Sequence, residues 1–157
     1  MNMKAVIATH NKDKLKELKR ALSDLGIELL DLWDFPEIGE IIEDGETLKD
    51  NALIKARHVY DITGLPSIAD DTGLEVDALG GKPGVYTARF AGEGCTYGDN
   101  VNKMLKVMKN FEKRERGAKF RTVMAYVDSE KELFSEGEVK GVIAEGKLKD
   151  KNFFVAD

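Results

Sequence analysis

The sequence has little of several features on which whole classes of protein depend. Its 157 residues include one cysteine, Cys95, so an internal disulfide and a cysteine-based zinc site are excluded. No apolar run approaches the roughly 20 residues that a membrane-spanning helix needs. The net charge of −5 is opposite to the basic surface that nucleic-acid polymers attract. We therefore expect neither a membrane protein nor a nucleic-acid-binding protein, and any phosphorylated ligand must be held by local positive charge.

The remaining composition is typical of a soluble globular protein. Hydrophobic residues make up 42% of the chain and charged residues 34%. A chain of this length buries about 70% of the surface that it exposes when unfolded. The N-terminal apolar run is too short for a secretory signal and is better interpreted as a strand. We expect one domain over residues 1–157, located in the cytoplasm.

The hydrophobic pattern predicts an α/β fold. An apolar run over residues 3–8 ends in the polar Thr9-His10-Asn11, and leucines then recur at helical spacing until Gly26. A strand, a polar loop and a helix in this order open an α/β unit. The pattern further predicts a strand over 27–32 and a helix that begins with a Thr47–Asp50 capping box and ends at Gly64. A turn over 80–84 and a helix around 101–108 follow. The last predicted elements are a solvated basic loop over 109–121 and a hairpin of strands over 120–128 and 132–142.

Two adjacent aspartates, Asp70 and Asp71, follow a short apolar run at a predicted strand end. Like charges this close repel each other, so such a pair in a soluble protein usually holds a cation or a proton. Glu43 together with Asp71 suits Mg²⁺, which accepts one or two carboxylates and takes its other ligands from water and phosphate. The aspartates are therefore the first candidates for chemistry.

A second candidate group follows the first predicted strand. A loop that leads into a helix N-terminus is a natural anion site, to which Thr9 and Asn11 can add hydrogen bonds and Lys14 a charge. The same residues also fit a structural interpretation, in which Asn11 caps the helix and Lys14 lies at the surface. Lys55, from the second predicted helix, could help to neutralise the same phosphates.

Together these segments resemble the inosine/xanthosine triphosphate pyrophosphatase family, which hydrolyses non-standard purine nucleoside triphosphates to the monophosphate and pyrophosphate. Four stretches agree with the family in order, spacing and residue type. They are Ala8–Lys14 (ATHNKDK), Glu43–Ala56 (EDGETLKDNALIKA), Ala69–Leu79 (ADDTGLEVDAL) and Gly80–Gly92 (GGKPGVYTARFAG). The resemblance implies an α/β fold with a long twisted mixed sheet flanked by helices, two lobes around a central cleft, and a homodimer.

The resemblance also implies a role for each candidate residue. The substrate, a purine nucleoside triphosphate such as ITP, dITP or XTP, would be bound by Thr9, His10, Asn11, Lys14, Lys55, Thr72 and Arg89. Mg²⁺ would be held by Glu43, Asp70 and Asp71. Asp71 would also be the general base that activates water for attack on the α-phosphorus. A metal, lysines and one carboxylate base suffice for this chemistry, because it depends on charge neutralisation and on the placement of water.

The resemblance covers residues 3–144. Family members continue with a glycine-rich loop, a Phe-Gly-Tyr-Asp-Pro segment and a Ser-His-Arg motif that grip the base and the phosphates, and residues 145–157 do not carry these motifs. Three accounts of the difference stay open: a shortened chain, a wall supplied by another subunit, or stacking of Phe153 and Phe154 on the base. The alternatives to the enzyme are a nucleotide-binding module without turnover and a Maf-like pyrophosphatase for other modified nucleotides.

Overall fold

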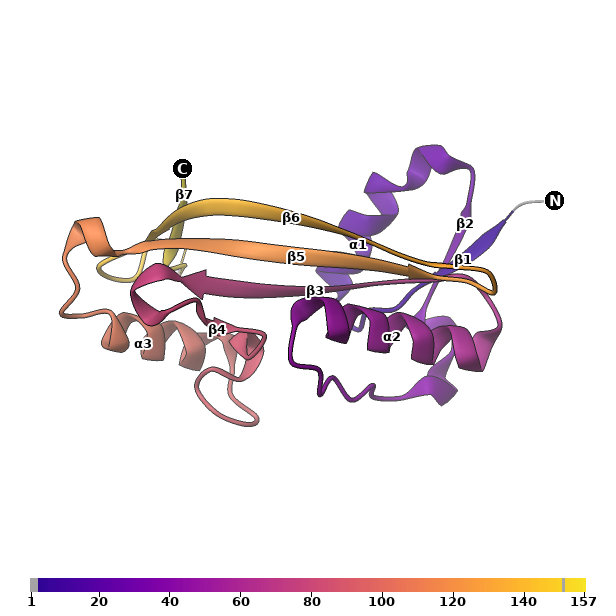
Figure 1. The fold of residues 1–157 in the computed structure, drawn as a ribbon, viewed down its shortest axis with the longest axis horizontal. Coiled ribbons are helices and arrows are strands. Elements are labelled where there is room, and N and C mark those ends of the chain that lie inside the picture. The colour runs from indigo at the N-terminus through magenta and orange to yellow at the C-terminus, as the bar shows by residue number, and fades with distance from the viewer. Residues whose placement is uncertain (1–2, 151) are drawn as a thin grey trace. The chain divides into compact units, whose positions relative to one another are not determined.

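The computed structural model describes residues 3–150 and 152–157, and over these residues the chain has the predicted α/β fold with a mixed sheet (Figure 1). Its elements are β1 (Lys4–Ile7), α1 (Lys12–Ala21), β2 (Glu28–Asp31), α2 (Leu48–Thr63), β3 (Ser67–Val76), β4 (Lys82–Gly84), α3 (Tyr97–Val107), β5 (Gly117–Val127), β6 (Glu132–Ile143) and β7 (Phe154–Ala156). None of the helices in this part of the chain is both long and apolar enough to cross a membrane.

The sheet combines parallel and antiparallel neighbours. Its strand order is β2-β1-β3-β5-β6-β7, and β4 pairs with β3 outside this path. β1 runs parallel to β2 and to β3, whereas β4 and β7 run antiparallel to β3 and β6. The chain forms two compact units, Met1–Asp71 with Val123–Ser135 (unit 1) and Thr72–Thr122 with Glu136–Asp157 (unit 2). Strands β3, β5 and β6 therefore each contribute residues to both units.

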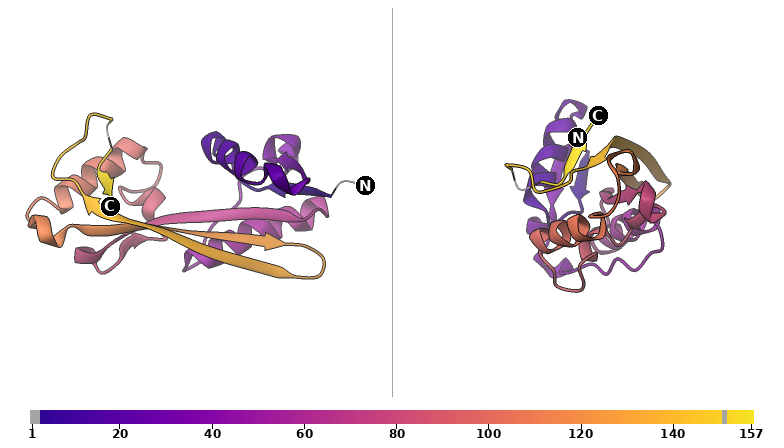
Figure 2. Two further views of the ribbon diagram at one scale, coloured as in Figure 1. Left: turned by 90° about the horizontal axis from the view of Figure 1, so that it is seen from above. Right: turned by 90° about the vertical axis from the view of Figure 1, so that its left-hand side faces the viewer.

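Unit 1 is organised around the parallel strands β1, β2 and β3. The side chains of residues 5–8 are fully buried, as expected for a parallel strand that is covered on both faces. Helices α1 and α2 lie on opposite sides of these strands (Figures 1 and 2). Since Ile7 pairs with Ile68 in register, the loop that follows β1 begins beside Asp70 and Asp71. The register thus brings the two predicted site segments of unit 1 together.

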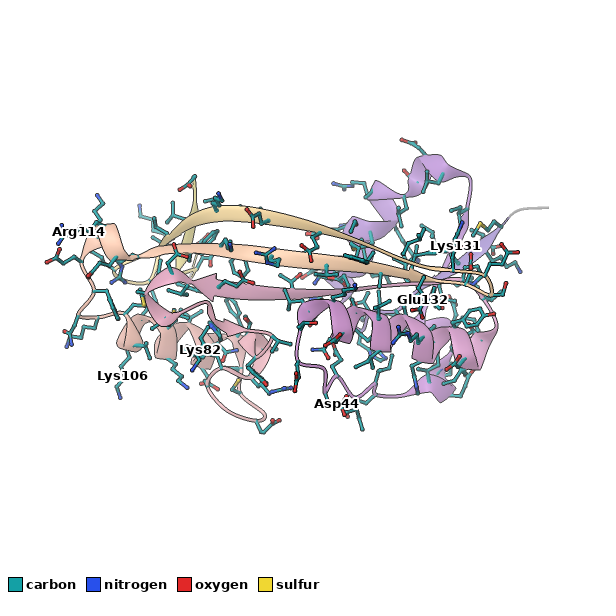
Figure 3. All side chains as sticks on the ribbon, viewed as in Figure 1. Asp44, Lys82, Lys106, Arg114, Lys131 and Glu132 are labelled. Carbon is teal, nitrogen blue, oxygen red and sulfur yellow. The ribbon has the colours of Figure 1, made fainter. Side chains whose placement is uncertain are left out.

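Helix α2 begins and ends at the predicted residues. Thr47 caps its N-terminus by accepting a hydrogen bond from the Asp50 N–H at 3.0 Å, which is one half of the expected capping box. Gly64 ends it in the left-handed conformation, with φ of 69°. From the second half of the helix, Arg57 donates two hydrogen bonds of 2.6 Å to Glu132, which is labelled at the start of β6 in Figure 3. Helix α2 is therefore fixed to the β5–β6 hairpin tip.

Unit 2 has a separate hydrophobic core between α3 and the sheet. The core consists of Leu74, Val76, Val101, Met104, Met108, Ala118, Ile143 and Phe153. Phe153 is 5% exposed and lies in this core, with its ring centroid 6.3 Å from that of Tyr97. Phe154 packs edge-on against Phe120, at 4.8 Å between ring centroids. The Phe153 ring is therefore occupied in the core, whereas Phe154 is partly exposed and its stacking on a base stays a prediction.

The predicted turn over residues 80–84 is only half correct. Gly80 and Gly81 adopt positive φ angles of 66° and 87°, as a turn requires, but Lys82–Gly84 forms the short strand β4. Its residues pair with Leu74–Val76 of β3. The turn chemistry of the sequence did not reveal that the next three residues extend the sheet.

The prediction of a solvated basic loop over residues 109–121 is wrong for its second half. Strand β5 begins at Gly117, and the Arg116 side chain is buried, with the residue 3% exposed. The Arg116 guanidinium donates four hydrogen bonds of 2.6–3.1 Å to backbone carbonyls, those of Met108, Phe111, Ile143 and Ala144. Arg116 thus joins the end of α3 to the end of β6.

Candidate active site

The two aspartates lie inside β3, not at a strand end as the sequence predicts. Because successive side chains of a strand point to opposite faces, Asp70 and Asp71 project away from each other. The two faces of unit 1 carry different helices, α1 on one side and α2 on the other (Figure 1). The repulsion expected of neighbouring carboxylates is thereby reduced, and each aspartate meets its own set of partners.

Asp70 forms an ion pair with Lys14 of α1. The Lys14 Nζ lies 2.6 Å from the Asp70 Oδ2, and the side chains are 30% and 3% exposed. A carboxylate this deeply buried needs a positive partner, because its desolvation is otherwise uncompensated. Asp70 therefore fixes the ammonium group of Lys14 close to the loop that follows β1.

That loop is arranged as a capped helix N-terminus. Asn11 has the extended backbone of an N-cap, and its side chain accepts hydrogen bonds from the backbone N–H groups of Asp13 and Lys14 at 3.0 and 3.1 Å. The Thr9 hydroxyl oxygen in turn accepts from the Asn11 N–H at 3.1 Å. The structural interpretation of Asn11 is thus confirmed. It is compatible with anion binding, because a capped loop presents the positive end of the helix dipole in a fixed shape.

Asp71 lies on the other face of β3 and is half-buried. Burial raises the pKa of its carboxyl group above the usual value, and the nearby charges of Glu43 and Asp70 act in the same direction. The positive charge of Lys55 and a hydrogen bond from Asn51 oppose this rise in pKa. In the part of the chain that the structure describes, Oδ2 of Asp71 is the buried side-chain polar atom without a hydrogen-bond partner. Such an orphaned oxygen is suited to receive a proton or a cation.

Lys55 and Glu43 form a second ion pair beside Asp71. The Lys55 Nζ lies 3.0 Å from the Glu43 Oε1, and the Lys55 side chain is 14% exposed. A cavity of about 370 Å³ opens next to this pair, and its walls include Thr9, His10, Glu43 and Lys55. Four of the predicted site residues of unit 1 therefore line one hollow.

The three carboxylates expected to hold Mg²⁺ are not gathered into a metal site. Over residues 3–150 and 152–157, no group of three or more histidine, cysteine, aspartate or glutamate side chains is placed to hold a metal ion. Asp70 is paired with Lys14 on the opposite face of β3. Glu43 and the unpartnered oxygen of Asp71 still fit Mg²⁺, which is commonly bound through one or two carboxylates and completed by substrate phosphates and water.

Thr72 and Arg89 belong to unit 2 and are described separately. The Thr72 hydroxyl lies 2.7 Å from the hydroxyl of Thr122 on β5, and the Arg89 guanidinium lies over the ring of Tyr86, 5.0 Å from its centroid. Their predicted contacts with substrate stay predictions.

Sequence reasoning missed Asn51, which is 2% exposed, accepts a hydrogen bond from the Gly45 N–H and lowers the pKa of Asp71. The signal for it was present, because residues four apart share one face of a helix and Asn51 is four residues before Lys55. A buried polar residue one helical turn before a site lysine is a candidate for a role at the same site.

Lys14→Met is expected to destabilise the fold by about 2 kcal/mol, less than the roughly 3–5 kcal/mol of a fully buried pair because Lys14 is partly exposed. The physical reason is that the buried Asp70 would lose its cation. Urea unfolding measures the effect, with exposed Lys16→Met on the same helix as the control. Equal losses for the two variants would show that the Lys14–Asp70 pair contributes no specific stability.

The site combines three features: parallel strands that end beside a capped helix N-terminus, two lysines in ion pairs, and a half-buried carboxylate. These features are typical of α/β proteins that bind phosphorylated ligands. The sequence profile of the Ham1 family matches residues 5–154, and the chain belongs to this family.

Similar proteins agree with this assignment. A protein from Thermoanaerobacter sp. (strain X514), named dITP/XTP pyrophosphatase, is 45% identical over 141 residues, which cover 90% of this chain and 71% of that relative. The structure of a HAM1 protein from Coxiella burnetii is similar with a TM-score of 0.86 at 34% identity, covering 96% of this chain and 78% of that one. A crystal structure from Mycobacterium abscessus, described as a nucleoside-triphosphatase / dITP/XTP pyrophosphatase, gives a TM-score of 0.85 at 40% identity, covering 98% and 84%.

Proposed function

We propose that this chain hydrolyses non-canonical purine nucleoside triphosphates, namely ITP, dITP and XTP, to the nucleoside monophosphate and pyrophosphate, with Mg²⁺ as the cofactor. The names of its relatives support the substrate class. The observation that carries the proposal is the unpartnered, buried oxygen of Asp71 beside the Lys55–Glu43 pair. This arrangement combines a proton acceptor, a cation and a second carboxylate next to a helix N-terminus.

In the proposed reaction, water attacks the α-phosphorus of the substrate. A bond forms between the water oxygen and the α-phosphorus, and the bond from that phosphorus to the α–β bridging oxygen breaks. The bridging oxygen leaves with pyrophosphate, and Asp71 accepts the proton that the attacking water loses. Mg²⁺, held by Glu43 and Asp71, would supply charge neutralisation on the phosphate oxygens.

The remaining residues bind and orient the substrate in this proposal. The α1 N-terminus with Thr9, His10 and Asn11 binds phosphate oxygens, and Lys14 and Lys55 add positive charge. Both lysines are already fixed by carboxylates, at 2.6 and 3.0 Å, so little rotamer entropy remains to be lost on binding. Thr72 and Arg89 are kept in the proposal as substrate-binding residues. We also propose that the protein is cytoplasmic and that it forms a homodimer. Light scattering after gel filtration tests the homodimer.

The proposal is tested by product analysis with ITP, dITP, XTP, ATP, GTP and the pyrimidine triphosphates, each with Mg²⁺ and with EDTA. The expected result is one monophosphate and one pyrophosphate per turnover, only with Mg²⁺ and fastest with ITP, dITP or XTP. In H₂¹⁸O the label should appear in the monophosphate, because attack at the α-phosphorus places the water oxygen there.

Other outcomes would replace the proposal with a stated alternative. Label in pyrophosphate or stepwise release of orthophosphate would move the attack to another phosphorus. A preference for pyrimidine triphosphates would favour the Maf-like hypothesis. A rise in melting temperature with Mg²⁺ and ITP without pyrophosphate release would identify a nucleotide-binding module.

A further inference from the structure

The loop that carries Glu43 is fixed to helix α2 by the side chain of Asn51. Asn51 is 2% exposed, and its Oδ1 accepts a hydrogen bond of 2.7 Å from the Gly45 N–H. Gly45 is two residues after Glu43 on the segment that leads into α2, where Figure 3 labels the intervening Asp44. The position of Glu43 therefore depends on a hydrogen bond made by the first turn of the helix.

The close approach at Gly45 leaves no space for a side chain. A Cβ atom at this position would lie 2.6 Å from the Cβ of Asp50 and 2.7 Å from the Oδ1 of Asn51. Contacts this short force a shift, and the Asp50 contact is to an atom fixed by the helix. The backbone at residue 45 can thus lie against α2 only because the residue is glycine.

The same Asn51 side chain also reaches β3. A hydrogen-bonding interaction with Asn51 lowers the pKa of the Asp71 carboxyl group. Lys55, one helical turn further along α2, forms the 3.0 Å ion pair with Glu43 and lies close enough to Asp71 to act on its charge. Two residues on one face of α2 therefore each bind the Glu43 loop and lower the pKa of Asp71.

We propose that Asn51 is a positioning residue of this site, which holds the loop of Glu43 through the Gly45 N–H, so that Glu43 and Asp71 are both presented to one divalent metal ion. This inference rests on the proposed function. A neutral amide suits the task, because it offers an acceptor and a donor at once without adding charge beside two carboxylates. Aspartate lacks the donor, lysine lacks the acceptor, and alanine lacks both.

The first experiment measures hydrogen–deuterium exchange of the protein without metal or nucleotide, for wild type, Asn51→Ala and a matched control, Asn102→Ala at an exposed position of α3. In Asn51→Ala the segment 41–47 is expected to exchange at least about tenfold faster, because the Gly45 amide loses its acceptor. The exchange of β1 and α3 should be unchanged. Unaltered exchange in 41–47 would overturn the proposal, and so would a uniform increase over the whole chain.

The second experiment measures the Mg²⁺ concentration that half-saturates pyrophosphate release, with kcat and KM determined separately, in Asn51→Ala and in Gly45→Ala. The two variants disturb the same hydrogen bond from opposite partners, and Gly45→Ala leaves the Asn51 amide intact. Both are expected to raise the half-saturating Mg²⁺ concentration by about 10- to 100-fold, as changes to groups behind metal ligands do, with Asn102→Ala unchanged.

The two experiments separate failure of this inference from failure of the proposed function. If wild type releases no pyrophosphate, the proposed function fails, and the exchange of segment 41–47 still decides whether Asn51 holds the loop. If wild type is active and both variants keep its half-saturating Mg²⁺ concentration within about twofold, the positioning role is wrong and the proposed function stands.

Discussion

Asp71→Asn is expected to lower pyrophosphate release by about a thousandfold, a size typical of the loss of a general base. The substitution keeps the shape of the side chain and removes its ability to take up a proton from water. Nucleotide binding in EDTA should be retained, because Lys14, Lys55 and the α1 N-terminus are untouched and only the Mg²⁺ contact of Asp71 is altered. Release is measured with saturating ITP and Mg²⁺, and binding by the melting temperature with a non-hydrolysable analogue.

The same substitution is expected to raise the melting temperature at neutral pH in EDTA. The pKa of Asp71 is raised in the folded state, chiefly by burial. The contribution of Asp71 to the free energy of unfolding is therefore fully present below the unfolded pKa of about 3.9, and it is lost as pH rises through the folded pKa. The asparagine side chain carries no charge and does not undergo this loss. The difference between variant and wild type should therefore be small near pH 4 and grow with rising pH.

The control for this prediction is Asp61→Asn, which removes an exposed carboxylate from the same helix that faces Asp71. It should change neither pyrophosphate release nor the dependence of stability on pH. An Asp71→Asn protein that keeps more than about a tenth of wild-type turnover would exclude Asp71 as the base. One that melts below wild type at pH 7 would show that its ionised carboxylate stabilises the fold.

Arg116→Leu is expected to destabilise the protein by about 3–5 kcal/mol, which lowers the melting temperature on the order of 10 °C for a chain of this size. The leucine would fill part of the space but would remove the guanidinium donors from four backbone carbonyls, of which that of Met108 keeps the hydrogen bond from the Phe111 N–H. The decrease in the free energy of unfolding should be the same with and without Mg²⁺ and nucleotide.

Arg114→Leu is the matched control, because it removes the same side chain two residues away, where it is 83% exposed (Figure 3). Its effect on stability should stay within about 0.5 kcal/mol. Urea unfolding of both variants gives the comparison directly. A difference of less than about 1 kcal/mol between them would mean that the carbonyls around residue 116 find water as an equivalent partner.

The elements that the sequence predicted well are those whose signals are local. The apolar run before Thr9 predicts a buried strand, and Thr47 and Gly64 predict the ends of α2 because capping and the left-handed conformation are decided within a few residues. The carbonyls that receive the Arg116 guanidinium are instead up to 28 residues away, so a basic segment gave no sign of burial. The burial of Arg116 is decided by partners far away in the sequence, and the local composition does not indicate them.

The candidate site shows the same division. The sequence identified Lys14, Lys55, Glu43 and Asp71 as candidates, and in the structure Lys55 and Glu43 form an ion pair whose charges act on the carboxyl group of Asp71. It did not predict that β3 continues through the aspartates, because two charges and a glycine are unusual inside a strand. Because β3 continues through both aspartates, Asp70 lies on the face opposite to Asp71, where it forms an ion pair with Lys14.

The alternation of Asp70 and Asp71 along β3 has a consequence for how this protein can vary. One dipeptide faces two helices, because its first residue forms an ion pair with Lys14 of α1 and the pKa of its second is lowered by Lys55 and Asn51 of α2. Insertion or deletion of a single residue earlier in β3 would invert the faces and give each aspartate to the wrong helix. Within the strand before Asp71, a change in length of even one residue would therefore exchange the two charges between the faces of the sheet.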